Sequence, residues 1–81
     1  MSESLCPITD LPIGAKATVA EINVPPQHRG RLLEMGLLNG TALELIRFAP
    51  MGDPVEIKVR GYHLTLRRAE AELIMVRALT R

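Results

Sequence analysis

The side chains that could bind a metal ion or attack a substrate are few in this sequence and lie far apart. Cys6, His28 and His63 are the thiol and imidazole candidates, and their spacing fits no compact metal-ligand motif such as C-x-x-C or H-x-x-x-H. Ser2 and Ser4, at the N-terminus, have no positioned base near them in the sequence. The sequence therefore predicts no catalytic residue, no metal site and no cofactor, and we do not expect an enzyme.

A structural interpretation suits these side chains better. His28 falls in the first turn of an expected helix and His63 on the polar face of an expected strand, so both are predicted to be surface imidazoles. Cys6 is the only cysteine, which excludes a disulfide within the chain and favours a reducing compartment. The nucleotide-binding motif G-x-x-x-x-G-K-[ST] is also absent, so we expect no nucleotide hydrolysis by this chain itself.

Composition narrows the class of protein further. The net charge is +1, from 10 basic and 9 acidic side chains, and this balance argues against a nucleic-acid partner. Phe48 and Tyr62 are the only aromatic residues, too few for a base-stacking platform or for a groove that binds proline-rich peptides. The sequence contains neither a signal peptide nor an apolar run long enough to cross a membrane. We therefore expect a cytoplasmic protein that would reach a membrane only through a partner, without inserting directly.

The elements that must position any functional side chain are mostly short strands. With 81 residues, the chain has room for one small domain, expected at residues 11–81 after a loose lead-in at residues 1–10. Glycine and proline mark the breaks between elements: Pro25 ends the first strand, Gly36 ends a helix, and Arg60-Gly61 forms a hairpin turn. The alternation of apolar residues predicts strands at residues 15–24, 41–48, 55–59, 62–67 and 73–79, a helix at 27–35, and a helical turn at 68–72.

The apolar alternation is interrupted inside two of the expected strands. It slips by one position between Val19 and Ile22, and again between Leu45 and Ile46. Such a slip predicts a β-bulge or a sharp bend, because a change of one residue moves the side chains to the other face of the sheet. Five short strands with bends of this kind favour a mostly-β fold, a strongly curved and partly closed small barrel.

Five segments of the chain, taken in order, resemble the ferrous iron transport protein A (FeoA) family. The resemblance covers residues 11–76. It lies in Leu11-Pro12-Ile13-Gly14, in Arg31-Leu32-Leu33-Glu34-Met35-Gly36-Leu37 followed by Gly40, in Ala49-Pro50-Met51-Gly52-Asp53-Pro54, in Leu64-Thr65-Leu66-Arg67, and in residues 69–74. The resemblance implies an SH3-like β-barrel of about five strands with a short inserted helix.

The same resemblance implies a function in bacterial iron(II) uptake. It predicts a small accessory protein that docks on, and modulates, the cytosolic part of FeoB, the inner-membrane iron(II) transporter that carries a GTP-binding domain. The alternative is a metal-responsive module related to the SH3-like C-terminal domain of iron-dependent repressors, with His28, His63 or carboxylates as ligands. A chain with no room for a DNA-binding domain favours the stand-alone accessory. Self-association through exposed strand edges stays open.

The helix and one loop provide the candidate contacts with a partner. We expect Leu32 and Met35 to face the core, and Gly36 and Gly40 to provide positive φ angles. Leu37 and Leu38 are adjacent, so one should face inward and the other outward. The outward residues of this segment are expected beside a stiff proline-containing loop with Met51 at its tip. The predicted partner-binding residues are Arg31, Glu34, Leu37, Leu38, Pro50, Met51 and Asp53.

Ion pairing within the domain is the simpler interpretation of several charges. Arg31 and Glu34 are three residues apart on the expected helix and could pair on its surface. Arg67 is expected to be a structural ion-pair partner for Glu34 or Glu44 rather than a binding residue.

Overall fold

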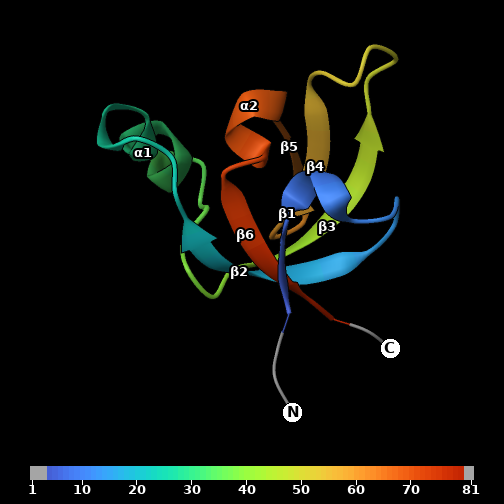
Figure 1. The fold of residues 1–81 in the computed structure, drawn as a ribbon, viewed down its shortest axis with the longest axis horizontal. Helices are drawn as coiled ribbons and strands as arrows, with labels where there is room; N and C mark the ends of the chain where they lie inside the picture. The colour runs from blue at the N-terminus through green and yellow to red at the C-terminus, as the bar shows by residue number, and fades with distance from the viewer. Residues whose placement is uncertain (1–3, 80–81) are drawn as a thin grey trace.

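The computed structural model describes residues 4–79 and shows one curved antiparallel sheet with two short helices beside it (Figure 1). The six strands follow the order β1-β6-β2-β3-β4-β5. Their bounds are β1 Leu5–Pro7, β2 Lys16–Ile22, β3 Ala42–Phe48, β4 Val55–Val59, β5 Tyr62–Leu66 and β6 Ile74–Ala78. The helices are α1 Pro26–Glu34 and α2 Arg68–Ala71, with a short 3-10 turn, η1, at Ile8–Asp10. Within the described residues, β1 and β5 are the two ends of the sheet, so strand pairing does not close the barrel.

The predicted mostly-β, SH3-like fold with one inserted helix is confirmed, with one strand more than expected. Residues 5–10 were expected in the loose lead-in, but Leu5–Pro7 pairs with β6, with Cys6 opposite Val76. Ile8, which follows in η1, is fully buried. Sequence periodicity could not show β1, because a strand of three residues ending in proline has no measurable alternation. Residues 1–3 of the expected lead-in lie outside the described residues.

Both predicted interruptions of the strand pattern are β-bulges. The register of β2 against β6 shifts between Val19 and Glu21, and that of β3 against β4 shifts between Leu45 and Arg47. A bulge bends its strand and increases the local twist, which lets a single sheet curve around its own apolar face. The enclosed core is aliphatic. Its buried members are Ile8, Leu11, Ala17, Val19, Val24, Leu32, Leu37, Leu43, Leu45, Val55, Ile57, Val59, Leu66, Ala71, Ile74 and Val76.

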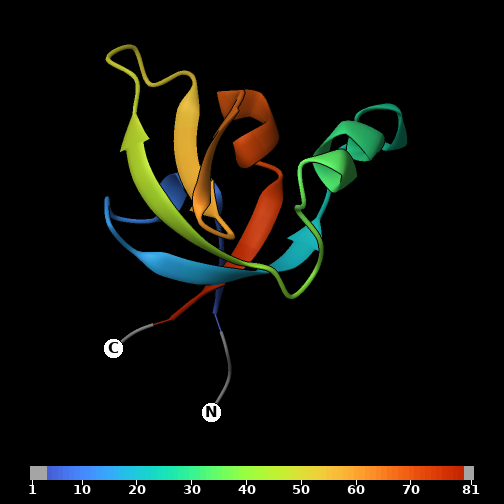
Figure 2. The same ribbon diagram turned by 180° about the vertical axis from the view of Figure 1, so that it is seen from behind.

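Helix α1 stands at one side of the sheet rather than across its core (Figure 2). Pro26 begins the helix, where proline has the required φ and no amide hydrogen to lose. Leu32 is its single buried residue, and Met35, at the C-cap, is half-buried against the core. Gly36 has a φ of +92°, and the Leu37 N–H then donates to the Leu32 carbonyl at 3.0 Å. Leu32 and the glycine turn therefore both help to fix the position of the helix.

The helices of the described part are short. No helix between residues 4 and 79 is long and apolar enough to span a lipid bilayer.

Candidate partner-binding cleft

A cleft of about 440 Å³ lies between α1 and α2. Its apolar lining comes from the end of the β2–α1 connection, from α2 and from the residue before β6. Its rim is charged. The lining residues are Val24, Pro25, His28, Arg31, Arg67, Ala69, Glu70 and Leu73. A concave apolar surface with a few charged groups at its edge is the usual form of a binding site.

An ion pair joins the two walls of the cleft. The Arg31 guanidinium on α1 contacts the Glu70 carboxylate on α2. The Glu70 side chain is only 12% exposed, whereas that of Arg31 is 47% exposed. Arg31 therefore reaches a residue 39 positions away, and the surface pair with Glu34 suggested by their spacing does not form. The α1 wall is also held to the segment before it, because Arg29 donates to the Val24 carbonyl through Nε at 3.3 Å and through Nη2 at 3.2 Å.

Of the contact residues predicted in the helix segment, the structure exposes three and buries one. Arg31 and Glu34 are exposed on α1, and Arg31 lines the cleft. Leu37 is fully buried, whereas Leu38 is 43% exposed. The expectation that one of these two leucines faces inward is confirmed. Leu37 is thus corrected from a candidate contact to a core residue, because its side chain is buried within the apolar core.

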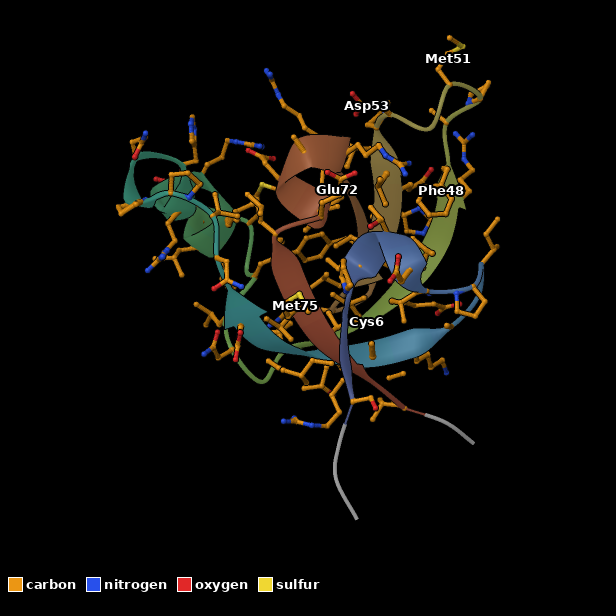
Figure 3. The ribbon with its side chains drawn as sticks, viewed as in Figure 1. Cys6, Phe48, Met51, Asp53, Glu72 and Met75 are labelled. Atoms are coloured by element: carbon orange, nitrogen blue, oxygen red, sulfur yellow. The ribbon has the colours of Figure 1, made fainter. Side chains whose placement is uncertain are left out.

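The second predicted group lies on the loop between β3 and β4. Pro50 is exposed, and Met51 is 91% exposed at the tip, pointing away from the body of the molecule (Figure 3). Asp53 lies on the side of the loop nearer α2, where its Oδ1 accepts a hydrogen bond from the Arg68 N–H at 3.0 Å. Arg68 Nη1 also donates to the Gly52 carbonyl at 3.3 Å. The loop is therefore fastened to α2, and Met51 is presented on a fixed support.

The two predicted groups do not form one surface. We expected the loop of residues 50–54 beside the outward residues of the helix, but α2 lies between α1 and this loop in both ribbon views. The expectation failed because it placed the segments by their order in the sequence. In the fold, α2, from near the C-terminus, occupies the position next to α1.

Of the eight lining residues, only Arg31 was predicted to contact a partner. His28 and Arg67 were interpreted as surface or structural residues, and no binding role was assigned to Val24, Pro25, Ala69, Glu70 or Leu73. Arg67 forms no ion pair with Glu34 or Glu44 in the described part of the chain, and it lines the cleft instead. One signal was available: Leu73 precedes Ile74, and only one of two adjacent strand residues can face the core. Leu73 is indeed 40% exposed.

The described residues do not assemble a metal site. No group of three or more His, Cys, Asp or Glu side chains between residues 4 and 79 could hold an ion. Burial, reinforced by the nearby Asp10 carboxylate, raises the pKa of the Cys6 thiol above its ordinary value of 9.0. A raised pKa keeps the thiol protonated at neutral pH, which disfavours thiolate chemistry. His63 Nδ1 lies 2.7 Å from Glu56 Oε2, on the outer face of β4 and β5.

This Glu56 cluster predicts a pH dependence of stability. The hydrogen bond with His63 is the largest cause lowering the pKa of Glu56 below its ordinary value of 4.5, and Arg47, whose Nε lies 2.9 Å from Oε1, adds to it. A lowered pKa in the folded state stabilises the fold above pH 4.5, and this contribution is lost as the pH falls through the lowered value. Glu56→Gln should therefore be less stable than the wild type at pH 6 and equally stable in strong acid.

Urea unfolding followed by circular dichroism from pH 6 to strong acid measures this difference. Glu34→Gln is the matched control, since it removes an exposed carboxylate of α1, and we expect its difference from the wild type to stay small at every pH. A Glu56→Gln difference that persists unchanged into strong acid would show that the amide disturbs packing rather than removing an ionised partner.

Fold and cleft together define a class: a small SH3-like domain with a concave surface beside its curved sheet. Comparison with known proteins agrees with this fold class. The FeoA domain model matches residues 6–78, beginning within β1. The chain therefore belongs to the FeoA domain family, a family of ferrous iron transport.

Two relatives illustrate the membership. The chain is 30% identical over 73 residues to the Fe(2+) transport protein A/Fe(2+) transporter FeoB fusion protein of Porphyromonas gingivalis. The match covers 90% of this chain and only 9% of that much longer relative. The solution structure of the FeoA protein from Chlorobium tepidum has a TM-score of 0.86 with 42% identity, covering 91% of this chain and 70% of the other.

A third likeness concerns the fold alone. A manganese-dependent transcriptional repressor has a TM-score of 0.86 at 18% identity, and the match covers 98% of this chain but 44% of the repressor. The predicted relation between this fold and that of a repressor domain is therefore confirmed at the level of architecture.

Proposed function

We propose that this protein is an accessory of iron(II) uptake that docks on the cytosolic part of the transporter FeoB and modulates it. The observation that carries the proposal is the Porphyromonas gingivalis relative, in which the two components form one fusion protein. Joining two proteins in one chain raises their effective concentration and is productive when they function in contact. The proposal places this chain in the cytoplasm, peripheral to the membrane through its partner, with no nucleic-acid ligand.

The proposed mechanism is a shift of population. A ligand shifts an equilibrium between two conformations by its difference in affinity for them. A domain with a pre-formed cleft, and with no cluster of metal ligands among residues 4–79, is suited to this role, since it can act by binding alone. Of the predicted contacts, Arg31 lies at the cleft, Glu34 and Leu38 are exposed around α1, and Pro50, Met51 and Asp53 form a second candidate surface on the far side of α2.

Titration of this protein into the purified cytosolic domain of FeoB from the same organism tests the proposal. We expect saturable binding by calorimetry, together with a changed rate of GTP hydrolysis or of iron(II) uptake by the full transporter in vesicles. Heat-denatured protein is the control for non-specific effects. No binding to any cytosolic part of FeoB, together with normal iron uptake after deletion of this protein, would refute the proposal.

The alternative is a metal-responsive regulatory module, for which the likeness to the manganese-dependent repressor fold is the motivation. Calorimetric binding of manganese(II) or iron(II) at micromolar concentration, lost when His28 or His63 is replaced, would favour it. The separation of these two residues weighs against it, because His28 lies at the cleft while His63 pairs with Glu56 on the sheet.

A further inference from the structure

The apolar part of the cleft between α1 and α2 is open to a ligand. Pro25, Ala69 and Leu73 contribute exposed surface, and Leu73 is 40% exposed although it is aliphatic. Covering an exposed aliphatic side chain that lines a concave site with an apolar group is favourable, in proportion to the area removed from water. The cleft therefore favours an aliphatic side chain over a polar one.

The charge around this apolar surface is positive. The one carboxylate in the lining, Glu70, is mostly buried and contacts Arg31. Arg67 lies at the rim without a carboxylate partner among residues 4–79, and His28 adds an imidazole. An arginine at the edge of an apolar cleft pairs well with a carboxylate, because the guanidinium donates in a planar fork and is weakly hydrated.

The walls of the cleft are already fixed before anything binds. The Arg31–Glu70 pair joins α1 to α2, and the Tyr62 hydroxyl donates to the Met35 carbonyl at 3.2 Å, which ties the end of α1 to β5. A site whose side chains are held by existing bonds loses little conformational entropy on binding. A short ligand segment can therefore bind without a large contact area.

From these observations we propose that the cleft binds a partner segment in which an aliphatic side chain stands next to a carboxylate. The aliphatic group packs on Pro25 and Leu73, and the carboxylate pairs with Arg67. This inference deepens the proposed function and rests on it for the source of the segment, which is the cytosolic part of the transporter. It assigns a role to Arg67 and Leu73, both outside the predicted contact set.

The chain itself contains segments of similar chemistry, and the one on the exposed β3–β4 loop is Met51-Gly52-Asp53. It lies across α2 from the cleft, so only a second copy could present it. Asp53, however, already accepts the Arg68 N–H through Oδ1, and the loop is bonded to Arg68 a second time through Gly52. A partner segment with a free carboxylate satisfies Arg67 better, and occupation by a second copy is an outcome that the experiment distinguishes.

The first test uses the peptide acetyl-Gly-Asp-Leu-Glu-Gly-amide and nuclear magnetic resonance of the whole chain. At millimolar peptide we expect shifts confined to the signals of Ala69, Leu73 and the residues around Pro25. The same peptide with glycine in place of leucine, or with lysines in place of both acids, should give no shifts there. Shifts elsewhere, or none with any peptide, would overturn the proposal. Cleft shifts that appear without peptide, grow with protein concentration and vanish in Met51→Ala would assign the cleft to a second copy instead.

The second test compares the peptide affinities of three single-substitution variants. Arg67→Glu should weaken peptide binding by about tenfold or more, while Arg67→Lys, which keeps the charge but loses the planar fork, should weaken it less. Lys16→Glu makes the same change of net charge at the start of β2, at the opposite end of that strand from α1, and should change binding by less than about twofold. Equal weakening by Arg67→Glu and Lys16→Glu would show a general charge effect and overturn the site.

The same variants separate this inference from the proposed function. If the FeoB cytosolic domain binds wild type and Arg67→Glu equally well, the cleft is not the docking site, while docking itself stands. If the acidic peptide binds the cleft but no part of FeoB binds the protein, the cleft chemistry is right and the proposed partner is wrong.

Discussion

Replacing Leu32 with alanine is expected to lower the free energy of unfolding by about 2–4 kcal/mol, the usual cost of truncating a buried leucine. Leu32 is fully buried and is the single buried residue of α1. A domain of 81 residues has a total stability of roughly 4–12 kcal/mol, so the loss is a large fraction of it. We expect α1 to be the first part of the fold to loosen, because the truncation removes its one fully buried side chain.

Leu33→Ala is the matched control, since it makes the same truncation at the next position of the same helix. Leu33 is 49% exposed, and we expect a cost of no more than about 1 kcal/mol. Urea unfolding gives both free energies, and amide hydrogen exchange of residues 26–34 reports on α1 alone. Similar losses for the two variants would show that Leu32 does not anchor the helix. A folded Leu32→Ala protein with fast exchange in α1 should also bind cleft ligands weakly, because one wall of the cleft is loose.

Elements dominated by local patterns could be predicted from the sequence. The strand periodicity located β2 to β6 to within a few residues, and the phase slips at Val19 and Leu45 marked real bulges. The glycine after α1 and the Arg60-Gly61 turn were found for the same reason: a positive φ has a strong preference for particular residues, and Gly36 and both turn residues have it. These features depend on neighbours within about five residues.

The candidate site could not be predicted in this way, because distant segments form it. Arg31 was selected correctly as an outward residue, but its partner Glu70 is 39 positions away. Arg67 and Leu73 looked ordinary in sequence, and only the return of α2 to the side of α1 makes them lining residues. Spacing along the chain predicts which residues share one face of a helix. It does not predict which other helix will lie against that face.

Gly36→Ala is expected to destabilise the protein by roughly 1–3 kcal/mol, although it adds only one methyl group. The φ of Gly36 is +92°, a conformation unfavourable for a residue with a Cβ. The new Cβ would also stand 3.3 Å from the Tyr62 hydroxyl, which donates to the Met35 carbonyl at 3.2 Å. The hydroxyl must therefore move, and the bond that ties the end of α1 to β5 is weakened along with the turn.

Gly30→Ala, which lies within α1 itself, is expected to have the opposite effect on stability. A Cβ at Gly30 would meet no atom within 4 Å beyond the neighbouring backbone of its own helix, and its φ is outside the positive range, so alanine should stabilise α1 by about 0.5–1 kcal/mol. Urea midpoints of the two variants should therefore move in opposite directions from the wild type. If Gly36→Ala were neutral, the turn after α1 would tolerate ordinary residues, and its glycine would not be what positions α1 beside the cleft. If both variants were destabilising, the cost would come from α1 as a whole rather than from the conformation at Gly36.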